Sequence, residues 1–298
     1  MKTKKNYTTI NDLSNKYGIS ARTIRNYCAS GKIEGCIKNG KTWLIPEDAH
    51  FPMKKIQSND LLSRIKLEKQ SHITGGIYHK IQIELTYNSN HMEGSRLTSE
   101  ETRYIYETNT IGLDNKTINV DDIIETVNHF KCVDYIIDHV NYKLTESMIK
   151  HLHYLLKSGT SDSRNDWFIV GDYKVLENEV GGQVTTPVEN VSKEIKSLLK
   201  NYNSKENIAL EDIIAFHYAF EKIHPFTDGN GRVGRLIMFK ECLRNNITPF
   251  IIEDDIKLYY YRGLKEWKNE KGYLIETCLS SQDKFKTYLD YFKIPYKD

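Results

Sequence analysis

Apolar residues recur at helical spacing along most of the chain, and polar runs separate the helices that this spacing predicts. Two such segments, residues 213–220 and 236–243, flank a polar run at residues 224–235. Gly229 and Gly231 within that run favour turn conformations over a continuous helix. The pattern therefore predicts a mainly α-helical body in which a loop joins two core helices. Further helices are expected from Leu61, over 77–90, from about Leu97, over 120–139 and over 145–157.

The first fifty residues follow a different pattern, in which short elements alternate with turn residues. Thr9 is expected to cap a helix that ends at Tyr17, and a tight turn at 18–20, where Ser20 is the next cap, precedes a second helix over 21–29. Residues 33–37 and 42–45 predict two strands joined by an Asn-Gly turn. This is a winged helix-turn-helix pattern, which we assign to residues 1–52. Residues 51–59 contain the expected linker, and the helical body is assigned to residues 53–298.

Charge is unevenly distributed between these two parts. Residues 1–55 contain eleven basic and four acidic residues, a net charge of +7, so the remainder carries −5 within the total of +2. A basic module of this kind favours DNA binding. We expect the second helix to enter the major groove and the hairpin to contact phosphates, through Arg22, Thr23, Arg25 and Asn26 on the helix and Lys38 and Lys41 on the hairpin. The alternative is a protein-interaction module of the same shape.

Cysteine usage and hydropathy address the cellular compartment. The five cysteines are scattered without the spacing of a metal site, which favours reduced thiols. No apolar run reaches membrane-spanning length, and no apolar segment follows the basic residues at the start of the chain. We therefore expect a cytoplasmic protein with no membrane partner.

The loop at 224–235 gathers the residue types that phosphoryl or nucleotidyl transfer needs. His224 is a candidate general base, because histidine titrates near neutral pH. Asp228 offers a hard oxygen ligand for Mg²⁺. Residues 229–231 open a helix, so that their backbone N–H groups can bind an anion. Arg232 and Arg235 lie one turn apart on that helix, where both can bind phosphate oxygens.

This loop resembles the signature of the Fic family, His-x-Phe-x-(Asp/Glu)-Gly-Asn-Gly-Arg-x-x-Arg, at every defined position. The resemblance implies the Fic fold and transfer of AMP from ATP to a protein Ser, Thr or Tyr hydroxyl. It also implies Mg²⁺ or Mn²⁺ on Asp228 and phosphate binding by Gly229, Asn230, Gly231 and Arg232, with Arg235 on the γ-phosphate. The related Doc branch, which phosphorylates, has Lys at the position of Gly231, so the glycine favours adenylylation. The N-terminal part resembles DNA-binding domains of the MerR and excisionase type.

Three further assignments follow from the same resemblance. Residues 77–94 match the inhibitory motif (Ser/Thr)-x-x-x-Glu-(Gly/Asn) of many Fic proteins, with Ser89 and Glu93 as its defined positions. Its glutamate is expected to pair with Arg235 and to displace the γ-phosphate. Residues 171–186, which contain a Gly-Gly hairpin signal, are assigned to the flap that presents the target segment. Tyr261 is the expected residue of the adenine pocket.

The sequence thus predicts an autoinhibited, self-modifying protein adenylyltransferase behind a DNA-binding domain. Two alternatives stay open at this point. Glu93 could position water for the removal of AMP from a modified protein, or the chain could be a DNA-binding regulator that senses nucleotide without turnover. The target protein, the DNA site and the formation of a homodimer are left open.

Overall fold

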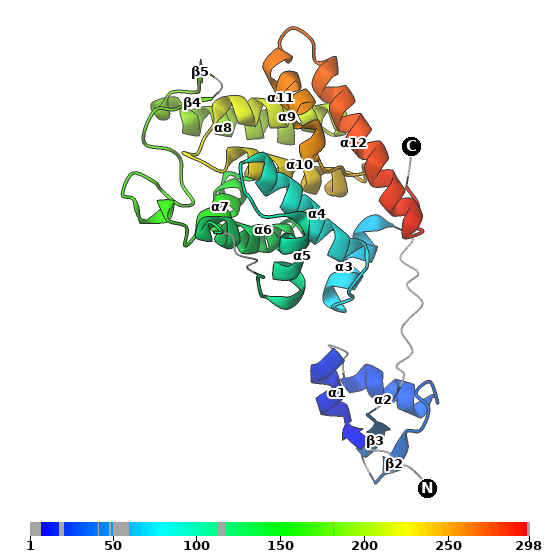
Figure 1. Ribbon diagram of the computed structural model, residues 1–298. Helices are drawn as coiled ribbons and strands as arrows, with labels where there is room; N and C mark the ends of the chain where they lie inside the picture. Colours follow the sequence, from blue (N-terminus) through cyan, green and yellow to red (C-terminus); the bar gives the residue numbers. More distant parts are fainter. Residues whose placement is uncertain are drawn as a thin grey trace.

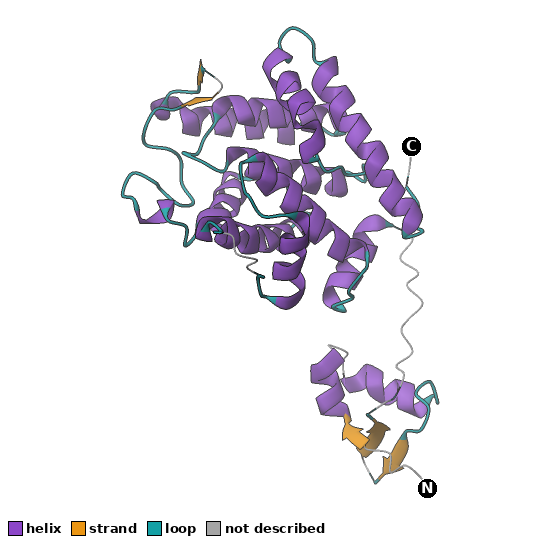
Figure 2. Ribbon diagram, viewed as in Figure 1, coloured by secondary structure: helices purple, strands orange, loops and turns teal. Residues whose placement is uncertain are grey.

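The computed structural model describes residues 7–17, 21–40, 42–47, 49, 60–112, 117–180 and 182–296. Within these ranges, strands are confined to the N-terminal part and to one short hairpin, and the other regular elements are helices joined by loops (Figure 2). The expected mainly α-helical class is confirmed. None of the described helices is both long and apolar enough to cross a bilayer.

The N-terminal part is a small three-stranded sheet with two helices (Figure 1). Its apolar centre joins side chains from both helices to the sheet, including Ile24 and Ile45. Thr9 caps the first helix as expected, since its hydroxyl accepts from Asp12 N and donates to the Asp12 carboxylate. The elements are β1 (Tyr7–Thr9), α1 (Ile10–Tyr17), α2 (Ala21–Ala29), β2 (Ile37–Asn39) and β3 (Thr42–Pro46), in the sheet order β1-β3-β2.

Two details of this part differ from the sequence expectation. The strand expected at 33–37 begins only at Ile37, because Gly35 has a φ of 79°, which interrupts an extended backbone. Strand β1 was not expected at all. The structure also brings the thiols of Cys28 and Cys36 to 3.2 Å, which nothing in the sequence indicated. The turn at 18–20 with Ser20, the linker at 51–59 and Lys41 lie outside the described residues.

The body is a bundle of ten α-helices, within the described ranges, around one large apolar core. Its central helix, α10, is buried along almost its whole length and packs against α4, α6, α7 and α9 (Figure 1). The helices are α3 (Leu61–Gln70), α4 (Ile77–Met92), α5 (Ser99–Thr108), α6 (Val120–Asp138), α7 (Glu146–Lys157), α8 (Val188–Asn203), α9 (Leu210–Ile223), α10 (Asn230–Arg244), α11 (Lys257–Glu266) and α12 (Gly272–Tyr291), with short 3₁₀ turns at Asp162–Arg164 and Asp254–Ile256.

The ends of these helices follow from local side-chain chemistry. Thr98 and Glu101 form a reciprocal capping box at the start of α5. Thr145 accepts a hydrogen bond from Met148 N at the start of α7. The expected flap contains a hairpin of two-residue strands, β4 (Glu179–Val180) and β5 (Gln183–Val184). Most of segment 171–186 is therefore loop.

Helix α4 is fixed at its N-terminus by a buried carboxylate. Glu68 is fully buried and accepts hydrogen bonds from Arg64 Nε at 2.5 Å and from Tyr78 N at 2.9 Å. A side chain at Gly76 would collide with it, because a Cβ there would lie 2.3 Å from Glu68 Oε2. The glycine thus lets α4 begin directly against the carboxylate.

Glu68→Ala is expected to lower the free energy of unfolding by about 2–3 kcal/mol, because it leaves Arg64 and the Tyr78 N–H without their partner. Urea unfolding followed by circular dichroism measures the change. Asp283→Ala is the control, since Asp283 forms an exposed ion pair with Lys286 and should change the free energy by less than about 0.5 kcal/mol. Equal effects of the two substitutions would contradict this account of α4.

Candidate active site

The loop between α9 and α10 has a conformation fixed by its own side chains. Helix α9 ends at His224, which adopts a left-handed conformation with φ 51°, and Gly229, with φ 80°, precedes α10. Asn230 Nδ2 donates to Phe226 O and its Oδ1 accepts from Phe226 N, both at 2.9 Å. Since Phe226 is fully buried, these bonds fix the loop to the core. The Asn230 side chain is therefore held against the loop, and its backbone N–H is the group placed at the helix start to contact a ligand.

The first turn of α10 is an anion-binding position that a carboxylate already covers. The first N–H groups of a helix have no partner within the helix and carry its positive dipole end. A Cβ added to Gly231 would lie 2.3 Å from Glu93 Oε1 and 2.9 Å from Arg235 Nη1. Glu93 thus lies directly over this turn, at the position where a phosphate would bind.

The expected pair of Glu93 and Arg235 is present. Arg235 Nη2 donates to Glu93 Oε1 at 2.6 Å, and the same guanidinium donates to Ser89 Oγ at 3.0 Å and to Ser89 O at 2.9 Å. The Arg235 side chain is only 3% exposed, whereas that of Glu93 is 28% exposed. Despite burial, the charge of Glu93 holds the pKa of Arg235 above its usual value. Helix α4 and its C-cap residue Glu93 therefore hold this arginine.

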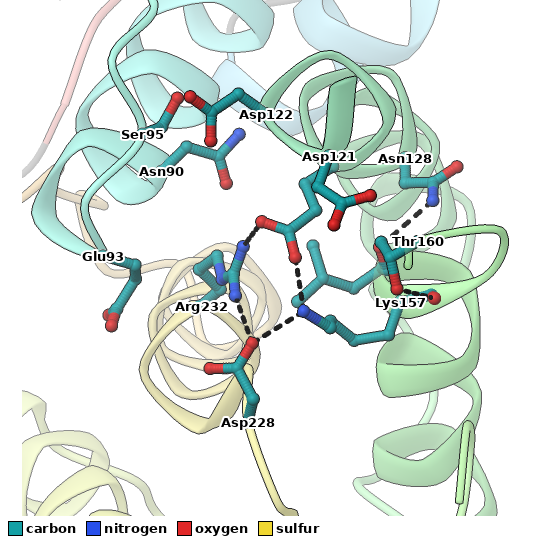
Figure 3. A network of polar contacts seen from close by, with 12 residues as sticks. Asn90, Glu93, Ser95, Asp121, Asp122, Asn128, Lys157, Thr160, Asp228 and Arg232 are labelled. Atoms are coloured by element: carbon teal, nitrogen blue, oxygen red, sulfur yellow. Dashed lines mark hydrogen bonds and ion pairs between the residues drawn. The ribbon is translucent and has the colours of Figure 1, made fainter. Parts of the chain in front are cut away.

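Arg232 belongs to a closed ring of four charged side chains (Figure 3). Glu125 of α6 accepts hydrogen bonds from Arg232 and from Lys157 of α7. Asp228 Oδ2 accepts from the same two cations, at 3.0 Å from Arg232 Nη2 and 2.7 Å from Lys157 Nζ. Within the ring two positive charges face two negative ones, and the more exposed Asp162 lies 3.6 Å from Lys157 Nζ as well, which makes the burial of Arg232 and Lys157 tolerable.

The ring sets the charge state of Asp228, which it contacts through Oδ2. Burial would raise the pKa of this carboxyl, but Arg232 and Lys157 outweigh it and hold the pKa well below its usual value. The side chain is 45% exposed. Among the described residues no cluster of three or more His, Cys, Asp or Glu side chains could hold a metal ion. Asp228 thus fits a Mg²⁺ ion that takes its remaining ligands from phosphate oxygens and water.

His224 is a neutral base in this environment. Burial, followed by the charge of Lys174, lowers the pKa of His224 to about 4. Its Nδ1 is buried and has no hydrogen-bond partner within the described ranges. An imidazole in this state can accept a proton at physiological pH.

The remaining expected site residues also lie near the loop. Tyr261 OH donates to Met92 O at 3.2 Å, which places it against the end of α4 beside Glu93. Its neighbour Tyr260 is buried and pairs with His217 Nε2 at 2.6 Å. Of the two, only Tyr261 is exposed enough to contact a nucleotide.

Sequence reasoning missed Glu125, Lys157 and Glu221. Glu125 and Lys157 lie on helices whose sequence pattern does not indicate contact with the loop at 224–235, and Lys157 is 71 residues before Asp228. Glu221 stands one turn before His224 on a largely apolar helix, and burial raises its pKa to about 8. An acidic residue among apolar neighbours was the one signal available, and it did not indicate a role.

Lys157→Met is expected to lower the free energy of unfolding by about 3 kcal/mol at pH 7, because it leaves the carboxylates of Glu125 and Asp228 close together without their shared ammonium. Most of this loss comes from Glu125, since the more exposed Asp228 is screened by water. The Asp228 contribution requires an ionised carboxyl, so it is fully present above the unfolded pKa of about 4, declines below it, and is lost only as the pH falls through the lower pKa of the folded state.

Lys150→Met provides the matched control on the same helix. Lys150 pairs with Asp172 and Glu146 at a more exposed position, so its loss should cost about 1 kcal/mol or less. Chemical denaturation of each variant and the wild type at pH 7 and at pH 3.5 gives the change in the free energy of unfolding for both substitutions at both pH values. A Lys157 effect no larger than that of Lys150 would show that the ring does not stabilise the site.

Comparison with known proteins agrees with this geometry. Residues 143–242 match the model of the Fic/DOC family, and residues 8–49 match that of a helix-turn-helix domain. A curated relative, the protein adenylyltransferase Fic of Nematostella vectensis, is 28% identical over 192 residues, which cover 60% of this chain and 42% of that protein. This chain thus spans about two fifths of the curated relative's length.

Solved structures show the same fold. A Fic domain-containing signalling protein of Bacteroides thetaiotaomicron is 27% identical, with a TM-score of 0.58 over 72% of this chain and 82% of that one. Fic-1 of C. elegans (residues 134–508) is 19% identical, with a TM-score of 0.62 over 74% and 65% of the two chains, and supports the fold alone. Residues 143–242 of this chain thus match the Fic/DOC family, and residues 8–49 match a helix-turn-helix domain.

Proposed function

We propose that this chain transfers AMP from ATP to a hydroxyl group of a protein, and that Glu93 restrains the transfer. The observation that carries the proposal is the loop at 224–235, which holds a neutral base at one end and an anion-binding helix N-terminus at the other. The relatives named protein adenylyltransferases support the same reading.

The nucleotide would bind through its phosphates. The backbone N–H groups of Gly231 and its neighbours, with Arg232, would hold the α- and β-phosphates. Arg235 would bind the γ-phosphate once Glu93 has left it. Mg²⁺ bound by Asp228 and phosphate oxygens would neutralise charge on the phosphates. Tyr261 would flank the base.

His224 would accept the proton of the target hydroxyl as its oxygen attacks the α-phosphorus. The bond from that phosphorus to the bridging oxygen breaks, and pyrophosphate leaves. The strand edges of β4 and β5 would hold the target segment through main-chain hydrogen bonds, which fix its backbone and select little by side chain.

Glu93 would act on how ATP binds rather than on whether it binds. Its carboxylate covers the first turn of α10 and neutralises Arg235, so the γ-phosphate cannot take that place. A triphosphate shifted by about 1 Å can react about a hundredfold more slowly, because the attacking oxygen and the phosphorus are no longer in line.

Glu93→Gly is therefore expected to raise AMP transfer by about a hundredfold, including transfer onto the chain's own hydroxyl side chains, with a smaller effect on ATP affinity. Mass spectrometry after equal incubation with ATP and Mg²⁺ measures the adduct. Glu93→Gln keeps the shape of the side chain and should give an intermediate rate. Adding His224→Ala to Glu93→Gly should abolish transfer without unfolding the protein.

Two outcomes would count against this mechanism. Equal modification of the wild type and Glu93→Gly would refute the restraint by Glu93. Faster loss of a pre-installed AMP from a modified protein in the wild type than in Glu93→Gly would assign Glu93 to the reverse reaction.

We also propose that the helix-turn-helix domain binds DNA through α2. Arg22, Arg25 and Asn26 are exposed on this helix, while Ile24 and Cys28 face the core. Lys38 is exposed on β2 of the hairpin. The exposed cations of helix and hairpin suit a duplex whose phosphates and base edges they contact together.

Arg22→Ala with Arg25→Ala in the full chain should lower affinity for duplex DNA by about tenfold or more and reduce its salt dependence. Arg96→Ala with Arg103→Ala, two exposed arginines of the body, is the control and should leave binding unchanged. Fluorescence anisotropy at several salt concentrations measures both. Absence of wild-type binding at low salt would favour a protein partner, and an ATP-dependent affinity without AMP transfer would indicate a sensor.

A further inference from the structure

Lys174 is a buried lysine that lies beside the loop at 224–235 and takes no part in the proposed transfer. It is only 2% exposed and lies in segment 171–186, three residues after Gly171. Its backbone N–H donates to Pro225 O at 2.9 Å, the carbonyl of the residue that follows His224. The flap segment is thus attached to the loop at the position next to the base.

The ammonium of Lys174 is bound by neutral oxygens alone. Nζ donates to Asn178 Oδ1 at 2.7 Å and to Thr185 Oγ1 at 2.5 Å. Both partners are neutral, and the charge of Glu177 offsets the burial only in part. A buried positive charge that donates hydrogen bonds to neutral oxygens is unfavourable, and burial accordingly lowers the pKa of Lys174. A methionine of similar length would fill this space without that cost.

The two partners of the ammonium extend the attachment of the flap. Thr185 Oγ1 also donates to the Asn178 side chain, and Asn178 Nδ2 donates to Phe226 O at 3.3 Å. The flap segment therefore binds two successive carbonyls of the loop, those of Pro225 and Phe226. Lys174 lies at the centre of this network, because it contacts Asn178 and Thr185 and binds the loop itself.

Three charged side chains act on the His224 imidazole from the elements around it. Lys174, from the flap segment, lowers the pKa of His224, whereas Asp228 of the loop and Glu93 at the end of α4 raise it. Bound phosphates would add negative charge and raise it further. Lys174 is the cation among these groups that opposes protonation of the base.

We propose that Lys174 is a positioning residue for His224, which fixes the flap to the loop by hydrogen bonds and by its charge keeps the imidazole neutral until the target hydroxyl arrives. The inference rests on the proposed function for its catalytic meaning. Its electrostatic part concerns the imidazole alone and can be measured without turnover.

The first experiment is an NMR titration of the His224 imidazole in the full chain, with the signal assigned by its absence in His224→Ala. Lys174→Met should raise the pKa of His224 above the wild-type value of about 4, because one opposing charge is lost while the burial remains. Asn178→Ala cuts the network and keeps the charge, so it should leave this pKa unchanged. An identical pKa in Lys174→Met and wild type would overturn the proposal.

The second experiment follows AMP transfer against pH in the Glu93→Gly background. A base works only when unprotonated, so activity falls as the pH drops through the pKa of His224. Lys174→Met should therefore shift this low-pH fall in activity (the acid limb) to higher pH and lower kcat. Lys174→Arg keeps the charge and should return the acid limb to its wild-type pH. Asn178→Ala should lower kcat about tenfold with the limb unmoved, because the flap is less well held.

A lower kcat in Lys174→Met with an unmoved acid limb would reduce Lys174 to a structural contact and overturn the proposal. Circular dichroism establishes that each variant is folded, and Lys174→Gln replaces Lys174→Met if the latter is not. If Glu93→Gly transfers no AMP at all, the proposed function fails. The NMR titration then still decides whether Lys174 holds His224 neutral.

Discussion

The reciprocal hydrogen bonds between the Asn230 side chain and the Phe226 backbone are the constraint on which the site depends. They join the start of α10 to a residue that is fully buried in the core. His224 lies two residues before Phe226, and the first turn of α10 begins at Asn230. The distance between base and anion site is therefore set by the core rather than by the loop, which suits a reaction whose rate depends on alignment.

The charges of the site are arranged so that no buried guanidinium is left alone. Arg235 pairs with Glu93, and Arg232 pairs with Glu125 and Asp228. Each arginine is buried, so an unpaired state would be costly. The two pairs differ in exposure of the acid, since Glu125 is 13% and Glu93 28% exposed. The Glu125 partner of Arg232 is thus buried in the body, while the partner of Arg235 lies where a ligand can reach it.

Much of this arrangement could be predicted from the sequence, because it depends on local patterns. Most of the helices, the loop at 224–235, the cap at Thr9 and the pairing of Glu93 with Arg235 follow from spacing or from a motif. The ring through Glu125 and Lys157 could not be predicted, since it joins three helices whose packing is a tertiary property. The strand expected at 33–37 failed on the φ of a single residue, Gly35, which composition does not reveal.

The anchoring of α4 determines how the restraint can be lifted. Glu68 holds its first turn and the Ser89 contacts with Arg235 hold its last, so the helix itself is fixed. The Glu93 side chain, by contrast, makes a single hydrogen bond to the described residues and stands at the helix end before Gly94. Its release needs a change of rotamer and no movement of a helix, and partly exposed side chains change rotamer within nanoseconds. If Glu93 restrains transfer as proposed, its carboxylate and the γ-phosphate of a bound nucleotide would exchange at one guanidinium, and the restraint would be a rapid equilibrium within the nucleotide complex.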